Sequence, residues 1–417
     1  MIAYPLCASA QPPESAQPSD SAQPSGSVQL SEAWSRTFGG PSSDPAGSVA
    51  VTADGGYILT GMTLSKGSGQ GDIWLVKTDK NGTEEWNKTF GGPKMDIGRS
   101  VIQAMGGGYV IAGSTKSSGA GNTDAWLVKT DENGTESWNR TFGSRSADDA
   151  ASVKQTADGG YILAGYTSRS GNNDLWLIRT DKNGTEEWNR TIGGPGNEEA
   201  NSVAETADGG YILAGKTNSY GFGRDSEEGY ADAWLVKTDG NGTEQWNIPL
   251  GGNMVDEAHS AIQTMDGGYV LTGCTNAMLF ADNPASEILV AKARHNGTLQ
   301  WQMSFGEPNR NEGQAVQQVE DGGYLVSGYT NSYGDSEGDA LVAGISPAGE
   351  VVWTKAFGGI GSQSPTALIR TEDGYVIAGS ANRPGAYDLD FWLQKLLSSS
   401  KSGEGITSDE KTTKEKG

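Results

Sequence analysis

The stretch DGGYILAG at residues 208–215 recurs through the chain with little change, and it decides the fold. Its tyrosine comes back at seven positions: Tyr57, Tyr109, Tyr161, Tyr211, Tyr269, Tyr324 and Tyr375. The copies are roughly 50 residues apart, a period typical of propeller arrays, in which each repeat is one blade packed on its neighbours. The sequence therefore predicts one closed array of seven blades instead of several unrelated domains.

Each repeat is predicted to form four β-strands. In the first repeat we expect strands at 48–53, 57–63, 72–78 and 84–90, separated by DGG at 54–56, a variable loop, and DKNG at 79–82. The pair Asn81-Gly82 predicts a type I′ hairpin turn, in which both central residues take positive φ. The middle strands are apolar, as expected of strands covered on both faces. The predicted fold is all-β, a seven-bladed β-propeller of four-stranded blades.

The two ends of the repeat region are out of phase with each other. The last repeat stops after a third strand at 390–395. The missing fourth strand has its counterpart at the start of the chain, where WSRTFGG at 34–40 matches WNKTFGG at 86–92. We therefore expect 34–38 to complete the seventh blade and to close the ring, which removes open sheet edges.

The propeller is expected to span residues 31–397. Residues 11–30 are rich in Pro, Ser and Gln and predict a disordered linker, and the polar residues 398–417 predict a disordered tail. The small-x-small pattern Ala8-Ser9-Ala10 is typical of a signal-peptidase site, so residues 1–30 are interpreted as a leader remnant followed by the linker. A disordered start that contains two alanines by chance is the alternative.

Composition limits the possible partners. The formal charge of −22 at pH 7 disfavours nucleic acid and anionic membrane surfaces, whereas cationic partners remain possible. Only two cysteines occur, Cys7 and Cys274, so the sequence predicts no disulfide framework and no cysteine metal site. No apolar run reaches the roughly 18 residues that a membrane span needs. With the leader pattern, this predicts an extracellular or cell-surface location.

The segment KTDKNGTEEW at 77–86 resembles the repeat of the pyrroloquinoline-quinone-like propellers, in which a strand ends at Asp, turns at Gly and reaches a Trp that docks the blade. Together with the DGGY motif, the WxxTFGG motif resembles the repeats of uncharacterised archaeal and bacterial cell-surface propeller proteins. The resemblance implies a propeller over residues 32–396. It also implies a quinoprotein-like oxidoreductase as one possible activity, although this chain lacks the adjacent cysteine pair that many quinoprotein dehydrogenases carry.

Few residues are suited to catalysis. All twelve tryptophans fall at repeat positions, where a packing role is expected in every blade. The two histidines, His259 and His295, occupy slots that other residues fill in other repeats, and we interpret them as tolerated surface variation. Cys274 also occupies a slot that other residues fill in other repeats, and we interpret it as a packing residue and not as a nucleophile. The sequence predicts no catalytic residue.

A ring of acids is expected where each blade leads into the next. The fifth residue after the glycine that closes each fourth strand is a carboxylate in five repeats and an amide in two: Asp44, Asp96, Asp148, Glu198, Asp256, Asn311 and Gln363. Such a ring of oxygens could hold calcium, the one cofactor considered, or attract a cationic partner. The alternative is that each carboxylate caps its own turn, together with the serine four residues later.

Aromatic residues that the repeat does not explain gather in the variable loops of repeats four to seven. They are Tyr220, Phe222, Tyr230, Phe280, Tyr333 and Tyr387. Loops on a rigid scaffold commonly carry recognition, and exposed aromatics suit a protein or glycan ligand. The alternative is that these side chains fold back over the backbone of their own loops.

Asn-x-Thr sequons occur at the tight turns between third and fourth strands, and they predict glycosylation at Asn81, Asn133, Asn183, Asn241 and Asn296. The sequence as a whole predicts a secreted or cell-surface, non-catalytic scaffold for binding or adhesion. An oxidoreductase of the quinoprotein kind, or a glycan-active propeller enzyme, is the alternative.

Overall fold

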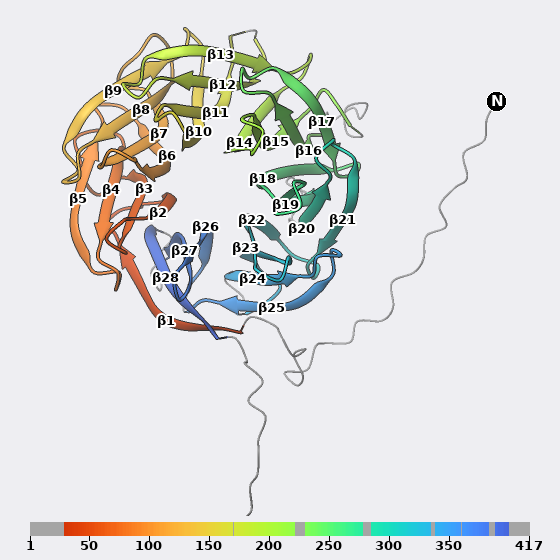
Figure 1. Cartoon of the computed structure of the whole chain (residues 1–417). Helices are drawn as coiled ribbons and strands as arrows, with labels where there is room; N and C mark the ends of the chain where they lie inside the picture. The colour runs from red at the N-terminus through yellow and green to blue at the C-terminus, as the bar shows by residue number, and fades with distance from the viewer. Residues whose placement is uncertain are drawn as a thin grey trace, which may run out of the picture.

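The computed structural model describes residues 29–169, 171–221, 230–277, 285–334, 338–359, 361–382 and 388–399. Within these ranges every regular element is a β-strand, β1 to β28, and the strands form seven four-stranded sheets. The sheets follow one another in a ring (Figure 1). The chain is a seven-bladed β-propeller.

Each of blades 1 to 6 consists of four antiparallel strands that are consecutive in the sequence, with the innermost strand first. Blade 1 contains β2 Ala46–Val51, β3 Tyr57–Thr63, β4 Asp72–Thr78 and β5 Glu84–Phe90. Blade 2 contains β6 Asp96–Gln103, β7 Tyr109–Thr115, β8 Asp124–Thr130 and β9 Glu136–Phe142. Blade 3 contains β10 Asp148–Gln155, β11 Tyr161–Thr167, β12 Asp174–Thr180 and β13 Glu186–Ile192. Blade 4 contains β14 Glu198–Glu205, β15 Tyr211–Thr217, β16 Asp232–Thr238 and β17 Glu244–Leu250. Blade 5 contains β18 Val255–Gln263, β19 Tyr269–Ala277, β20 Glu287–Ala293 and β21 Leu299–Phe305. Blade 6 contains β22 Asn311–Gln318, β23 Tyr324–Thr330, β24 Asp339–Ile345 and β25 Val351–Phe357.

Blade 7 is completed by the start of the chain. Its sheet order is β26 Gln363–Thr371, β27 Gly374–Asn382, β28 Leu389–Ser399 and then β1 Gln29–Phe38 as the outermost strand. β1 runs antiparallel to β28, with Thr37 opposite Trp392, and the Trp392 indole N–H donates to Ser35 Oγ at 2.9 Å. The predicted closure is confirmed. Both strands are longer than the sequence indicated, because pairing continues back to Gln29.

The turns differ in detail from the expectation. β2 covers 46–51 and not 48–53, because Thr52 and Ala53 join the DGG turn, where Gly55 N–H donates to Thr52 O at 2.8 Å. The type I′ prediction at Asn81-Gly82 is wrong, since Gly82 has φ +74° but Asn81 does not have positive φ. The turn spans four residues, and Asp79 Oδ1 accepts the N–H groups of Asn81 and Thr83, each at 2.8 Å. The turn is therefore stabilised by the hydrogen bonds of the aspartate carboxylate, and it needs positive φ only at the glycine.

Neighbouring blades are docked by repeated aromatic pairs. Trp34 on β1 packs against Tyr57 on β3 of the next blade, with ring centroids 5.9 Å apart, and the pair Trp86 and Tyr109 repeats this at 5.8 Å. The tryptophan also covers a turn of the next blade, because a Cβ added at Gly82 would lie 2.6 Å from the Trp34 ring. These contacts confirm the packing role that the sequence predicts for the tryptophans of the fourth strands.

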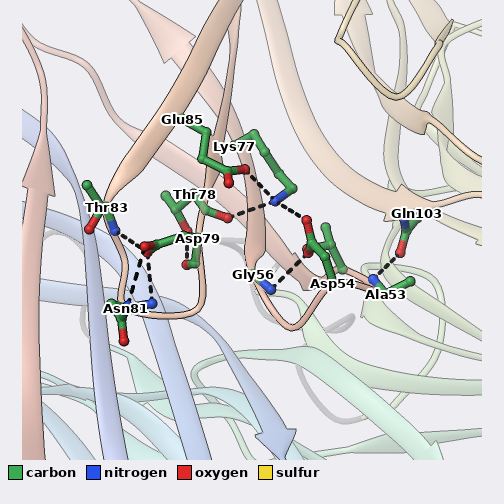
Figure 2. Close-up of polar contacts among 11 residues, drawn as sticks. Ala53, Asp54, Gly56, Lys77, Thr78, Asp79, Asn81, Thr83, Glu85 and Gln103 are labelled. Carbon is green, nitrogen blue, oxygen red and sulfur yellow. Dashed lines mark hydrogen bonds and ion pairs between the residues drawn. The ribbon is translucent and has the colours of Figure 1, made fainter.

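A buried lysine ties the two turns of a blade together, as Figure 2 shows for blade 1. Lys77 Nζ donates to Asp54 Oδ2 at 2.8 Å, to Glu85 Oε2 at 2.9 Å and to Thr78 O at 2.9 Å. Burial opposes the charge of Lys77, but its hydrogen bonds to Asp54 and Glu85 outweigh that penalty and raise its pKa. We call this contact between a turn carboxylate and a buried cation the turn clamp.

Blade 2 has the cation of the turn clamp without its carboxylate. Gly106 stands where blade 1 has Asp54, so Lys129 Nζ donates only to the carbonyls of Gly107 and Thr130, each at 2.7 Å. Burial then lowers the pKa of Lys129. This blade shows that the fold tolerates an incomplete clamp, and it offers a site for a stabilising substitution.

Gly106→Asp is expected to stabilise the protein by about 1 kcal/mol, because it supplies the missing partner of Lys129 and removes a flexible glycine from the unfolded chain. Gly106 does not have positive φ, and a Cβ there would meet no atom within 4 Å. The measurement is the free energy of unfolding in urea. The matched control is Gly107→Asp, where φ is +86° and strain should lower stability. Equal effects at both positions would contradict the clamp explanation.

Candidate functional site

Antiparallel pairing places the connections of each blade on two faces of the ring. The loops between second and third strands and the links to the next blade share one face, which we call the loop face. The DGG turns and the turns before the fourth strands share the other, which we call the turn face. The acid ring and the aromatic loops both belong to the loop face, because the ends of second and fourth strands lie at the same edge of an antiparallel blade.

Each ring carboxylate is buried and bonded within its own corner of the loop face. Asp96 accepts from Gly92 N–H at 2.8 Å, from Ser117 Oγ at 2.7 Å and from the hydroxyl of Thr115. Asp44, Glu198 and Asp256 repeat the bonds to the preceding loop and to a threonine at or near the end of the second strand. These contacts favour the alternative in which each acid caps its own loops.

The serines expected to share this capping do something else. Ser100 Oγ lies 3.3 Å from Val153 N of the next blade and accepts its N–H, and Ser152 does the same for Val203. The partners of the ring acids come instead from the second strand and the loop after it. In the described part of the chain, no three His, Cys, Asp or Glu side chains are arranged to hold a metal ion.

A second set of acids, which the sequence analysis did not single out, caps the variable loops. Asp72, the first residue of β4, accepts the N–H groups of Ser68 at 2.7 Å and Gly69 at 3.3 Å through Oδ2. Asp124 does the same for Ala120 and Gly121. The recurrence of Asp at the start of the third strand is the sequence signal that could have identified these caps. Two sets of carboxylates therefore hold the loops of blades 1 and 2 in place.

The aromatic candidates are only partly within the described residues. Tyr220 stacks on Trp234, with centroids 5.6 Å apart, and its hydroxyl donates to Gly193 O at 3.1 Å. Tyr333 packs against the core between blades 5 and 6. Tyr230 is half-buried. Phe222, Phe280 and Tyr387 lie outside the described residues.

These contacts give Tyr220 and Tyr333 a packing role, since both rings lie against the protein's own residues. Each side chain nevertheless stays half-exposed, so part of the ring faces solvent. The structure brings Tyr220 next to the link between blades 3 and 4, which the sequence alone did not indicate.

A polar network joins the innermost strands on the loop face of blades 4 to 6. Glu257 receives Asn201 Nδ2 at 2.8 Å and lies 3.6 Å from Lys216 Nζ, and His259 Nδ1 lies 2.8 Å from Gly313 O. Burial opposes ionisation of Glu257, but the positive charges of His259 and Lys216 lower its pKa. The interpretation of His259 as surface variation is wrong, because its ring links blade 5 to blade 6.

The position of His259 has the same role in other blades. Arg99, at the equivalent site in blade 2, contacts Asp149 of blade 3 through Nε at 2.8 Å. Opposite Glu257 in the sheet lies Cys274, which is buried, and burial raises the pKa of its thiol. A protonated, buried thiol is a poor nucleophile, which agrees with the packing role expected of it.

The asparagines of the predicted glycosylation sites are all exposed, at the turns of the turn face. The sequon asparagines inside fourth strands are different. Asn87 Oδ1 accepts the indole N–H of Trp74 at 3.2 Å while its amide donates to Glu84 at 2.6 Å. The turn positions are thus the ones whose side chains are open to modification.

Comparisons with known proteins support the fold. The structure is similar to the WD40 domain of Neurospora crassa Pan2, with a TM-score of 0.54 and 10% sequence identity over 87% of this chain and 95% of that chain. A structure of YCF48 bound to D1 peptide gives a TM-score of 0.48 at 10% identity over 90% of this chain and 99% of that chain. No family model and no curated protein matches the sequence. The similarity to the Pan2 domain agrees with the propeller fold and leaves the ligand open.

In the described part of the chain, no helix has the length and apolar character of a membrane span.

Proposed function

We propose that the protein is a secreted or cell-surface, non-catalytic scaffold that binds a protein or glycan ligand on its loop face. The observation that carries this proposal is where the repeat is broken. The connections β15–β16 at 218–231 and β19–β20 at 278–286 depart most from the common pattern, and they contain aromatic residues that the repeat does not require. A rigid ring that displays variable loops is a common arrangement for recognition.

The turn face is the weaker candidate for the ligand. It carries the turn clamps and the exposed asparagines of the sequons, and each of these recurs with little change in five blades. Glycans at Asn81, Asn133, Asn183, Asn241 and Asn296 would cover this face and its rim, and would leave the loop face accessible. A location outside the cell, where such glycans are added, is part of the same proposal.

A catalytic role has less support. His259 is engaged by a backbone carbonyl, and the raised pKa of Cys274 disfavours a thiolate. The ring acids are bonded by donors of their own loops, so the proposal assigns them to holding those loops and not to a calcium ion. The resemblance to the pyrroloquinoline-quinone-like propellers concerns the repeat sequence of the blades. The proposed function therefore includes no quinone cofactor.

The test is an alanine variant of three aromatics, Tyr220, Phe222 and Phe280. Binding to an array of oligosaccharides and purified extracellular proteins is expected to fall by 2 kcal/mol or more, about 30-fold, because truncated aromatic anchors typically cost this much. Tyr220→Ala alone is expected to lower the thermal midpoint slightly, since Tyr220 stacks on Trp234. Binding and unfolding are measured on the same preparations.

The matched control removes exposed apolar side chains elsewhere, by changing Met105, Met265 and Leu299 to alanine. This control is expected to bind as the unchanged protein does. Equal binding by all variants, or a loss of folding in the aromatic variant alone, would show that the aromatic loops only cover themselves and would overturn the proposal.

A further inference from the structure

The loops of blades 1 to 3 carry only positive charge. Their five segments on the loop face are 64–71, 91–95, 116–123, 143–147 and 168–173, and each contains one basic residue and no acid. The five basic side chains, all exposed, are Lys66, Lys94, Lys116, Arg145 and Arg169. We call this set the basic arc. It is unusual in a chain whose formal charge is −22.

Hydrogen bonds join these five loops into a continuous surface. Gly71 O accepts from Asp96 N–H at 2.8 Å, and Met95 O accepts from Lys116 N–H at 2.9 Å. Thr123 O then accepts from Asp148 N–H at 2.9 Å, and Ala147 O from Ser168 N–H at 3.0 Å. Each loop therefore touches the next, and the five cations follow one another along the loop face.

None of the cations of the arc forms an ion pair with another described residue. Lys66 Nζ lies over the ring of Trp74, 5.2 Å from its centroid. The acids beneath the arc, such as Asp72 and Asp96, are buried and bonded to N–H and hydroxyl donors of the loops. A ligand that approaches this part of the loop face meets the positive groups first.

The sequence of the other blades differs in charge. The segments between second and third strands of blades 4 to 7 contain two arginines and seven acids. Six of these acids lie outside the described residues. The exposed basic side chains of blades 1 to 3 are therefore a local departure from the negative charge of the whole chain, and an anion is attracted to them locally.

We propose that the basic arc binds an anionic polysaccharide, a sugar polymer that carries carboxylate or sulfate groups. Lys and Arg attract these groups, and the Ser, Thr and Asn side chains of the same loops can bond sugar hydroxyls. The five loops hold no aromatic residue, so nucleic-acid bases would find no stacking surface. Their only larger apolar residues are Leu64, Met95 and one proline, which leaves few places for the apolar side chains of a peptide.

This inference does not depend on the aromatic loops of blades 4 to 7. The two ligand surfaces occupy different blades, so each can fail without the other. The expected partner of the arc also differs from the cationic partner that the net charge suggested.

The experiment measures binding of the full chain to immobilised polygalacturonate and to immobilised dextran sulfate, at low and at physiological salt. The test variant changes Lys66, Lys94 and Lys116 to Gln. The matched control changes Lys80, Lys88 and Lys182 to Gln, three exposed lysines of the same blades that lie outside the loop face. Thermal midpoints of both variants establish that they are folded.

Binding to at least one polymer is expected, weaker at high salt, and reduced by about tenfold or more in the test variant but not in the control. Response to polygalacturonate alone identifies carboxylates as the recognised group, and response to dextran sulfate alone identifies sulfates. The proposal is overturned if neither polymer binds, if both variants lose binding equally, or if polyglutamate or single-stranded DNA of equal charge binds more tightly than both polysaccharides.

Discussion

Deletion of residues 29–38 is expected to lower the thermal unfolding midpoint by at least about 10 °C and to cause aggregation. The deletion removes β1, whose Leu30 and Phe38 are buried, and exposes the outer edge of β28. It also removes Trp34, which packs against Tyr57 and the Gly82 turn of blade 1. Calorimetry and light scattering measure the two effects.

Two further proteins make this test specific. A chain that lacks only residues 1–28 retains β1 and is expected to melt within about 2 °C of the full chain. Trp34→Ala and Trp86→Ala are expected to cost similar free energies, since the two rings occupy the same place in their blades. If the protein without 29–38 melted like the full chain, the ring would not depend on closure by its two ends.

The blade pattern could be predicted well because each strand is limited by local signals. The strands expected at 57–63, 72–78 and 84–90 match β3, β4 and β5, since turn residues mark the ends of each and every repeat gives the same answer. The innermost strand was misplaced by two residues. Its end depends on whether Thr52 and Ala53 pair with β3 or join the turn, which is a matter of hydrogen bonding that residue types alone do not decide.

The candidate site could be predicted less well because its contacts join distant parts of the chain. The sequence places the acids in a ring, but the hydroxyl that Asp96 receives belongs to Thr115, on the neighbouring strand. The link between His259 and Gly313 crosses from one blade to the next. The repeat spacing could have indicated it, since Arg99 and Asn201 at the same site also reach the next blade.

The basic arc shows a different limit. The net charge of −22 favours cationic partners only if its sign holds for every face. Strand direction separates the faces, and the charged side chains in the loops of blades 1 to 3 on the loop face are then all basic. Charge distribution over a fold is thus more informative about partners than the total.

Acid is expected to unfold the protein in the pH range from about 4 to 2, through the turn clamps. Burial would raise the pKa of Asp54, but hydrogen bonds from Lys77 and Thr52 lower it to about 2. Hydrogen bonds from Thr206 and Lys237 lower the pKa of Asp208 to about 2, and those from Lys292 and Thr264 do the same for Asp266. The clamp carboxylates Asp158 and Asp373 also have lowered pKa values.

A carboxyl group whose folded pKa lies below its unfolded value stabilises the fold at higher pH. The stabilisation by each clamp is therefore complete above the ordinary aspartate pKa of 3.8 and is lost as the pH falls towards about 2. The thermal midpoint is expected to change little from pH 7 to 5 and to fall steeply below pH 4. Asp256 acts in the opposite direction, because burial raises its pKa, but one such group opposes five clamps.

The decisive variant replaces Asp54, Asp208 and Asp266 together by Asn. It keeps the shape of the turns but removes three of the titrating groups, so its midpoint at pH 7 should be lower and its fall between pH 4 and 2 shallower than in the unchanged protein. Changing the exposed turn residues Asp131 and Asp239 to Asn provides the comparison, because these acids cap turns without a lysine partner. If the clamp variant fell as steeply with acid as the unchanged protein, the carboxylates that control acid unfolding would lie elsewhere in the ring.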